Sequence, residues 1–350
     1  MAGSGLSNDE KDIGMENHPE LIFFCELDAQ SLKKLFEDRF VLDDLKSLNA
    51  GVSLGMLDFS DERAQAVQKL NKLDIPVTAW LLLPKDQGYW FNLENTPQAI
   101  ARYEVFKQWS QRKKLKWAGI GLDIEPDINQ IQALFRQDRE AAASAIKRLK
   151  DKNAYEQATL AYNGLVNQIH QDGYEVEAYH LPVIADERKA RSSVLKRAAG
   201  LVDVPVDRDV LMLYSSFSRP RGQALLWQYA QDADAIGIGN TGGGVEMEGA
   251  PETASLSWEE FSTDLHLAWR TGKPVYVFSL EGCVRQGFLD RLITFDWNAP
   301  VEIPATGMVK VGRGGLRGAL WLGQRPWVGF AALAGLIGGV AVILGRKRRK

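Results

Sequence analysis

Two carboxylates, Asp123 and Glu125, end the apolar stretch WAGIGLDIEPD at residues 117–127 and are the side chains best placed for chemistry. In an extended strand the side chains alternate between faces, so both acids would share a face with Gly119 and Gly121. Buried carboxylates cost free energy unless they are paired or hydrogen-bonded, so this pattern favours acid–base chemistry. A structural pair, held by arginine or main-chain donors, is the alternative.

The elements that must position these acids alternate along the chain. Between the strands lie segments with helical periodicity, at residues 29–48, 61–73, 96–115, 192–199, 222–230 and 258–271. A longer connection, residues 128–173, is expected to hold two helices. Strand-like apolar runs occur at residues 21–27, 51–58, 76–83, 117–125, 175–182, 209–215, 235–239 and 275–281. Eight such alternations predict an α/β fold of the (β/α)8 barrel type.

Polar residues follow most of these runs. Functional residues of such barrels stand at the carboxyl ends of the strands. The polar residues at the predicted strand ends are Glu26, Asp28, Asp58, Asp123, Glu125, His180, Tyr214, Asn240 and Glu281. Strands one and eight are neighbours in a closed barrel, so Glu26 and Glu281 are expected side by side. Like charges in a confined site raise the pKa of at least one of them, which keeps a general acid protonated.

An aromatic loop is predicted on the same rim. Tyr89, Trp90 and Asn92 follow the third strand, and Trp80 lies within it. Flat aromatic faces and an amide suit sugar rings and their hydroxyls, although aromatic side chains also simply pack. The glycines at 242–244 are read as a turn or lid rather than a phosphate site, and His180 as either a base or a structural residue. No zinc motif or nucleophile elbow is present.

The run GLDIEPD resembles the fourth-strand signature of chitinase-like glycoside hydrolases. The D-x-E that ends their D-x-x-D-x-D-x-E pattern is matched by Asp123 and Glu125, whereas Gly119 and Gly121 replace the earlier acids. The run Met212–Tyr214 resembles the family's M-x-Y, although Ser215 stands where an acid would follow. The resemblance implies that Glu125 is the general acid, that Asp123 orients or stabilises the intermediate, and that Tyr214 donates a hydrogen bond to the substrate.

Three functions are therefore open. The leading prediction is a glycoside hydrolase-like barrel with a carbohydrate substrate and no cofactor, whose catalytic residues are Glu125 and Asp123 with Glu281 or Glu26 as second carboxylate. Its predicted substrate-binding residues are Asp28, Asp58, Trp80, Tyr89, Trp90, Asn92, His180, Tyr214 and Asn240. The alternatives are a lyase or aldolase that holds Mg²⁺ or Mn²⁺ with Glu26, Asp28, Asp123 and Glu281, and a non-catalytic sugar-binding or scaffold barrel.

The composition of the chain bounds its domain number and argues against some classes of function. The chain has 350 residues, 45% hydrophobic and 25% charged, which is enough for one large domain. A formal net charge of -3 argues against nucleic acid as a partner. Its two cysteines, Cys25 and Cys283, form no metal or redox motif.

The carboxyl-terminal end predicts a membrane anchor. Residues 327–345 are uncharged and are followed by five basic residues, 346–350. A helix of roughly 20 apolar residues spans a bilayer, and glycines within it allow weak self-association. No secretory-signal pattern occurs near Met1, which favours a single-pass protein with its barrel on the cytoplasmic face, whereas the basic tail favours the opposite. The predicted parts are a disordered segment 1–18, the barrel 19–297, a linker 298–326, the membrane helix 327–345 and the tail 346–350.

Overall fold

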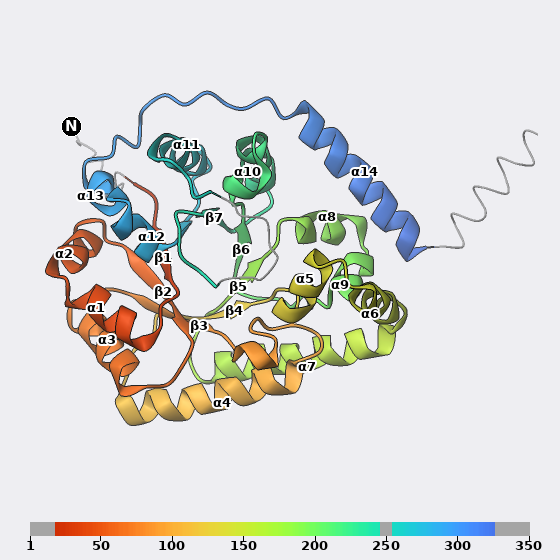
Figure 1. Cartoon of the computed structure of the whole chain (residues 1–350), viewed down its shortest axis with the longest axis horizontal. Coiled ribbons are helices and arrows are strands. Elements are labelled where there is room, and N and C mark those ends of the chain that lie inside the picture. The colour runs from red at the N-terminus through yellow and green to blue at the C-terminus, as the bar shows by residue number, and fades with distance from the viewer. Residues whose placement is uncertain (1–17, 246–253, 326–350) are drawn as a thin grey trace, which may run out of the picture.

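A closed barrel of eight parallel strands forms the centre of the protein (Figure 1), in a computed structural model that describes residues 18–245 and 254–325. Each strand pairs with the next in the sequence, and β1 closes the barrel against β8. The strands are β1 (Leu21–Cys25), β2 (Gly51–Met56), β3 (Val77–Leu81), β4 (Gly119–Asp123), β5 (Val176–His180), β6 (Arg208–Met212), β7 (Ala235–Gly239) and β8 (Val275–Phe278). The predicted (β/α)8 barrel is confirmed.

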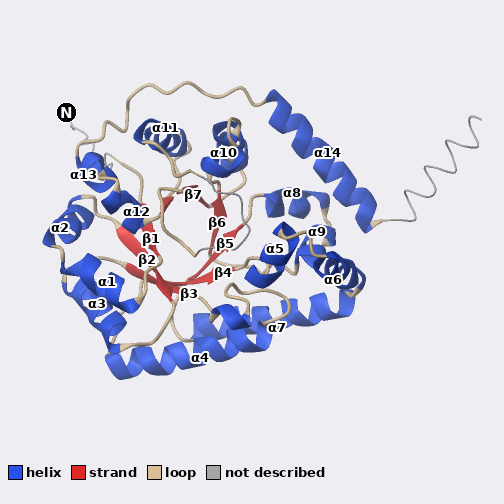
Figure 2. Ribbon diagram, in the orientation of Figure 1, coloured by secondary structure: helices blue, strands red, loops and turns tan. Residues whose placement is uncertain are grey.

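Helices surround this barrel on its outer side (Figure 2). They are α1 (Ala29–Glu37), α2 (Arg39–Ser47), α3 (Asp61–Lys72), α4 (Thr96–Lys113), α5 (Ile128–Phe135), α6 (Arg139–Lys150), α7 (Lys152–Gln171), α8 (Val183–Ala190), α9 (Val194–Ala199), α10 (Gly222–Ala230), α11 (Trp258–Trp269), α12 (Leu280–Arg285), α13 (Phe288–Ile293) and α14 (Gly307–Gln324). The connection after β4 holds three helices, α5 to α7, where the sequence predicted two. Asp138 and Asp151 cap the amino ends of α6 and α7 and so mark where these two helices begin.

Strand alternation separates two apolar layers. On β4, Ile120 and Leu122 face outward and join the core between the strands and the helices. Inside the barrel a second cluster forms around Phe24, Trp80 and Tyr179. Because neighbouring residues face opposite sides, Asp123 points into the barrel with Gly119 and Gly121.

A polar network closes the interior at the amino ends of the strands. The hydroxyl of Tyr276 donates to Oε1 of Glu177 at 2.7 Å, and that of Tyr179 to Oε2 at 3.1 Å. The guanidinium of Arg208 lies 3.7 Å from Glu177 and also binds Glu20. Since both oxygens of Glu177 have partners, the network serves as a structural floor.

The glycine at 121 is required by close packing. A Cβ there would lie 2.7 Å from Cζ and 2.8 Å from Cε2 of Tyr179. The Tyr179 ring therefore occupies the space into which an acid at position 121 would point. This packing accounts for the absence of an acid at position 121.

Helix α14 occupies most of the segment 298–326 that the sequence predicted to be a linker. It lies against the outer side of α8 and α10 (Figure 1), and its Arg313 is buried there. Between residues 18 and 325, leaving aside 246–253, no helix is long and apolar enough to cross a bilayer. The predicted anchor 327–345, the tail 346–350 and almost all of the predicted disordered segment 1–18 lie outside the described residues.

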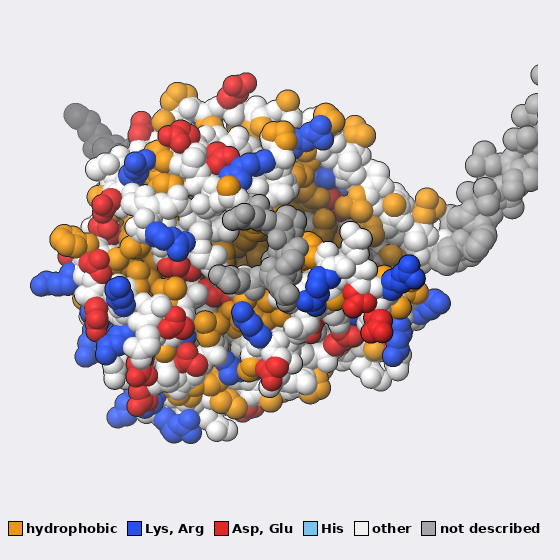
Figure 3. All heavy atoms as spheres, viewed as in Figure 1, with side chains coloured by type: hydrophobic (Ala, Val, Ile, Leu, Met, Phe, Trp, Pro, Cys, Tyr) orange, Lys and Arg blue, Asp and Glu red, His pale blue; other side chains and the backbone are white. Residues whose placement is uncertain are grey.

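Acidic and basic side chains are interspersed on the face in Figure 3.

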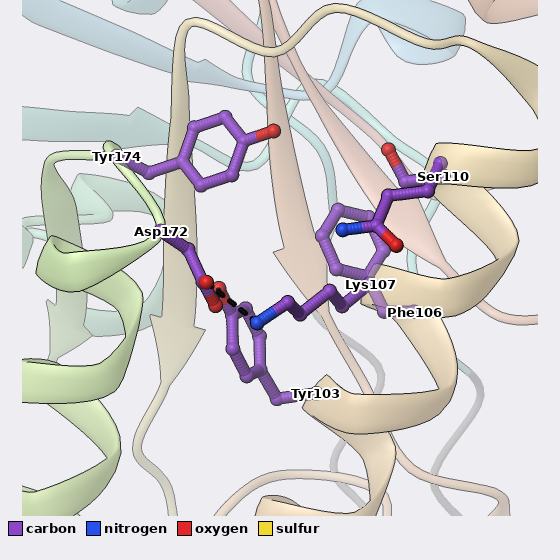
Figure 4. Close-up of a pocket in the computed structure, with 7 residues that line it drawn as sticks. Tyr103, Phe106, Lys107, Ser110, Asp172 and Tyr174 are labelled. Atoms are coloured by element: carbon purple, nitrogen blue, oxygen red, sulfur yellow. Dashed lines mark hydrogen bonds and ion pairs between the residues drawn. The ribbon is translucent and has the colours of Figure 1, made fainter.

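A pocket lies between α4 and the connection from α7 to β5, at the amino ends of the strands. Inside it the ammonium of Lys107 lies 2.5 Å from the carboxylate of Asp172, which also accepts the Tyr103 hydroxyl at 2.9 Å (Figure 4). This pocket and the acids at the carboxyl ends of the strands are at opposite ends of the barrel.

Candidate active site

Strand β4 and the loop after β3 fix the two central acids. The main-chain N–H of Phe91 donates to the carbonyl of Asp123 at 2.8 Å, and that of Glu125 donates to the carbonyl of Phe91 at 3.2 Å. This pairing continues the sheet beyond β4 and holds Glu125 at the mouth. Nε1 of Trp80 donates to Oδ2 of Asp123 at 2.9 Å. The other oxygen, Oδ1, is buried and has no hydrogen-bond partner among the described residues.

A third acid, Glu26, joins this pair from the end of β1. The Tyr89 hydroxyl donates to Oε1 of Glu26. The main-chain N–H of Glu26 donates to Oε1 of Glu281 at 3.4 Å, so these two residues are neighbours, as the closed barrel predicted. Glu281 is not on β8, however. Ser279 caps α12, and Glu281 lies in the first turn of that helix.

Burial is the main cause of the raised pKa values of the acids at the mouth. It raises the pKa of Glu125 to about 7. Burial and the nearby Glu125 charge raise the pKa of Asp123, although the Trp80 hydrogen bond opposes the rise. Burial, together with Glu281 and Glu125, raises the pKa of Glu26 to about 8 against the opposing hydrogen bond from Tyr89. The site therefore retains protons at neutral pH.

Aromatic side chains wall the mouth. Tyr214 stacks on Phe278 with ring centroids 5.6 Å apart and an interplanar angle of 26°. Phe278 packs in turn against Phe24 and Trp80. Burial raises the pKa of the Tyr214 hydroxyl, and the charges of Glu125, Asp123 and Glu26 raise it further. The Tyr214 hydroxyl therefore lies within range of the charges of all three acids.

Glycines after β7 bring the main chain onto the same acids. Gly243 and Gly244 have φ values of +96° and +88°, which side chains of L-residues rarely adopt. A Cβ on Gly243 would lie 2.6 Å from Oε1 of Glu281, and one on Gly244 would lie 3.4 Å from Oε2 of Glu26. Oδ1 of Asn240 accepts the N–H of Gly242 at 2.5 Å and shapes this loop. The glycine run thus covers Glu281 and borders Glu26.

Two of the predicted acids do not face the mouth. Asp28 is exposed and caps α1 by accepting from the main-chain N–H groups of Gln30 and Ser31. Asp58 binds Ser60 and the buried guanidinium of Arg63, at 2.8 Å from the latter. Burial opposes ionisation of Asp58, but the hydrogen bonds from Arg63 and Ser60 outweigh it and lower the pKa to about 2. Both acids stabilise the ends of elements.

His180, Asn92 and Trp90 also have structural positions. The His180 ring points outward from β5, and its Nδ1 lies 2.6 Å from Asp209. Oδ1 of Asn92 accepts the main-chain N–H groups of Glu94 and Asn95, which holds the loop before α4. Trp90 is buried against Tyr89, with ring centroids 5.4 Å apart. Of the predicted binding residues, Trp80, Tyr89 and Tyr214 contact or approach the acids.

Phe278 is the mouth residue that sequence reasoning missed. If Glu281 stood on the active face of the predicted strand 275–281, strand alternation would place Ser279 with it and Tyr276 and Phe278 on the opposite face. In the structure Val275 and Val277 face the helices, and Tyr276 and Phe278 face inward. The aliphatic pair of valines was the signal that could have reversed the assignment.

The predicted alternative is a Mg²⁺ or Mn²⁺ site formed by the acids Glu26, Asp28, Asp123 and Glu281. Within residues 18–245 and 254–325, no group of three or more His, Cys, Asp or Glu side chains is arranged to hold a metal ion.

No family model matches this chain, and no curated protein matches it. The glycoside hydrolase domain of PgaB (BpsB) from Bordetella bronchiseptica is similar, with 10% identity over 79% of this chain and 98% of that chain and a TM-score of 0.45. A GH18 chitinase from Pseudoalteromonas aurantia has 8% identity over 79% of this chain and 99% of that chain and a TM-score of 0.44. At such low scores the assignment of the site rests on the side chains described above.

Proposed function

We propose that this barrel is a glycoside hydrolase in which Glu125 donates a proton to the glycosidic oxygen. The observation that carries the proposal is the presence of Glu125, Asp123 and Glu26 at one aromatic-walled mouth. A general acid must be protonated at the working pH, and a pKa of about 7 for Glu125 meets that requirement. The aromatic faces suit the C–H surfaces of a sugar ring.

The other carboxylates have distinct proposed roles. Asp123 is held by Trp80 and supports Glu125, and its free Oδ1 is able to accept a hydrogen bond from the substrate. Glu26 is the preferred second carboxylate, because Glu281 is covered by Gly243. Glu26 would stabilise or attack the sugar once it loses its proton.

The test is a series of aryl glycosides whose leaving groups differ in acidity. A poor leaving group needs the proton from Glu125, whereas a good one departs without it. Glu125→Gln keeps the shape of the side chain but supplies no proton. We expect it to lose about 10²–10⁴-fold in kcat with poor leaving groups and much less with good ones.

The matched control is Glu156→Gln, an exposed acid on α7 whose loss should leave every rate unchanged. A uniform loss across the series, or a wild-type rate with poor leaving groups, would contradict the role of Glu125. Circular dichroism checks that both variants fold.

The same assays separate the two alternatives. Activity that disappears with a chelator and returns with Mg²⁺ or Mn²⁺ would indicate the metal-dependent lyase or aldolase. Glycan binding by both wild type and Glu125→Gln, without cleavage by either, would indicate a sugar-binding barrel.

We also propose that residues 327–345 anchor the barrel to a membrane as a single pass. The support is the sequence: an uncharged run of the right length and a basic end. An arginine at the centre of a membrane helix costs about 2.5–3.5 kcal/mol. Leu336→Arg should therefore increase extraction of the chain from membranes by alkaline carbonate, whereas Leu336→Ala should not.

A further inference from the structure

Helix α14 carries two of its three charged residues, Arg313 and Arg317, on the face that it buries. Arg313 donates to both oxygens of the fully buried Asp186, at 2.8 to 3.1 Å, and to the carbonyl of Gln228 at 2.7 Å. Arg317 donates to Asp186 at 2.7 Å. The Arg313 guanidinium also lies 3.8 Å from the ring centroid of Tyr229. These bonds fix the rotation of α14 about its own axis.

The opposite face of α14 is exposed and almost uncharged. Met308 is 65% exposed, Val311 78% and Leu322 44%, and Trp321, 41% exposed, lies at the edge of this face in line with Lys310. Glycines fill most of the space between them, and Lys310 is the single charged residue in this exposed set. A surface helix of a soluble protein has the reverse pattern, with apolar residues inward and charges outward. The composition of the exposed face of α14 therefore indicates that it contacts a binding partner.

The charge of the surrounding sequence indicates the occupant. From residue 303 to residue 350 the chain contains no Asp or Glu, and it contains nine Lys and Arg residues. The uncharged run 327–345 begins three residues after the end of α14. An apolar helix face with basic residues at its borders suits a bilayer with anionic headgroups, where such a helix lies in the plane of the interface.

We propose that α14 lies flat on the bilayer, with Met308, Val311, Trp321 and Leu322 inserted at the level of the headgroups. The inference goes beyond the proposed catalytic activity and holds whether or not the barrel cleaves a glycan. Because α14 lies along the flank of the barrel (Figure 1), the membrane would run beside the barrel and parallel to its axis. The mouth would then open along the membrane surface.

The test places an environment-sensitive fluorophore on single introduced cysteines of the full chain. The two native cysteines are buried and remain in place. Val311→Cys and Leu322→Cys report on α14. Phe40→Cys is the matched control, because Phe40 is 79% exposed and lies on α2, across the barrel from α14 (Figure 1).

The labelled chains are mixed with vesicles of phosphatidylcholine and phosphatidylglycerol that contain a lipid with a nitroxide just below the headgroup. We expect the labels at 311 and 322 to shift to shorter wavelength and lose most of their fluorescence, and the label at 40 to change little. Val311→Asp, combined with the label at 322, should reduce the quenching.

Other results would overturn the proposal. If the chain floats with the vesicles and the label at 311 behaves like the label at 40, the anchor stands and α14 faces water. If the label at 311 is unquenched and Val311→Cys cross-links two chains, the occupant is a second copy. If the chain does not float and no label is quenched, both the anchor and the docking of α14 are wrong.

Discussion

At the scale of single residues, the carboxyl groups at the barrel mouth hold more protons at neutral pH than exposed carboxyl groups would. Burial raises the pKa of Glu26, Asp123 and Glu125, and the charge of Glu125 raises the pKa of the other two further. Few of them ionise together, because each additional charge would be both desolvated and repelled. Proton donation is therefore the chemistry that this cluster performs most readily in the free protein.

The protonation of Glu26 should appear in the stability of the fold. Its pKa is about 8 in the folded protein and near 4.5 in the unfolded chain, so between these pH values the folded state binds more protons. Its contribution is fully present below pH 4.5 and is lost as the pH rises through 8. Glu26→Gln, which does not ionise, should make the fall in thermal stability between pH 5 and 9 shallower, by at most about 1.4 kcal/mol per pH unit.

Asp58→Asn is the control for this measurement. The pKa of Asp58 is lowered to about 2, so its contribution is present above the unfolded pKa and is lost only as the pH falls towards 2. Its variant should lose stability equally at pH 5 and 9. Parallel curves for wild type and Glu26→Gln would show that Glu26 titrates normally.

At the scale of elements, strand alternation predicts the direction in which a side chain points only while the chain stays extended. Asp123 is the last residue of β4 and, as predicted, shares a face with Gly121; the bond from Trp80 shows that this face is the inner one. Asp28 shared the two-residue spacing with Glu26, but the chain turns into α1 at that point and uses Asp28 as a cap. Glu281 lies in α12 for the same reason. The sequence thus predicted the acids of the strand ends better than those of the loops.

Tight packing between β4 and β5 is a second property that periodicity does not reveal. Gly121→Ala would bring a Cβ to 2.7 Å from Cζ of Tyr179, and an overpacked core of this kind loses about 1–3 kcal/mol. Gly164→Ala is the control, since nothing lies within 4 Å of its added Cβ and alanine favours the helix. Equal unfolding temperatures for the two variants would mean that Tyr179 moves freely.

At the scale of the whole molecule, eight strand–helix alternations sufficed to predict the barrel, whereas the docking of α14 was missed. The segment 298–326 has prolines, glycines and scattered basic residues, which resemble a linker in composition. Its helix is held by ion pairs with Asp186 on α8, a partner more than 100 positions earlier in the chain. Such long-range pairing leaves no local pattern in the sequence.

The ion pair of Arg313 should carry much of the attachment of α14. Arg313→Met removes one partner of the buried Asp186 and should cost about 3–5 kcal/mol, towards the lower end because Arg317 remains. Lys310→Met on the exposed face should change the stability by less than about 0.5 kcal/mol. Thermal unfolding of the full chain in detergent measures both. A Lys310→Met loss equal to that of Arg313→Met would place the attachment elsewhere.

The contact between Gly121 and Tyr179 also bears on the descent of this barrel. An acid at position 121 cannot be accommodated while the tyrosine ring fills the adjoining space. Any lineage that passes between an acid-rich fourth strand and the present one must change both positions. For an acid to appear at position 121, Tyr179 must first be replaced by a smaller residue. If the acid came first, the intermediate protein would be overpacked at this contact.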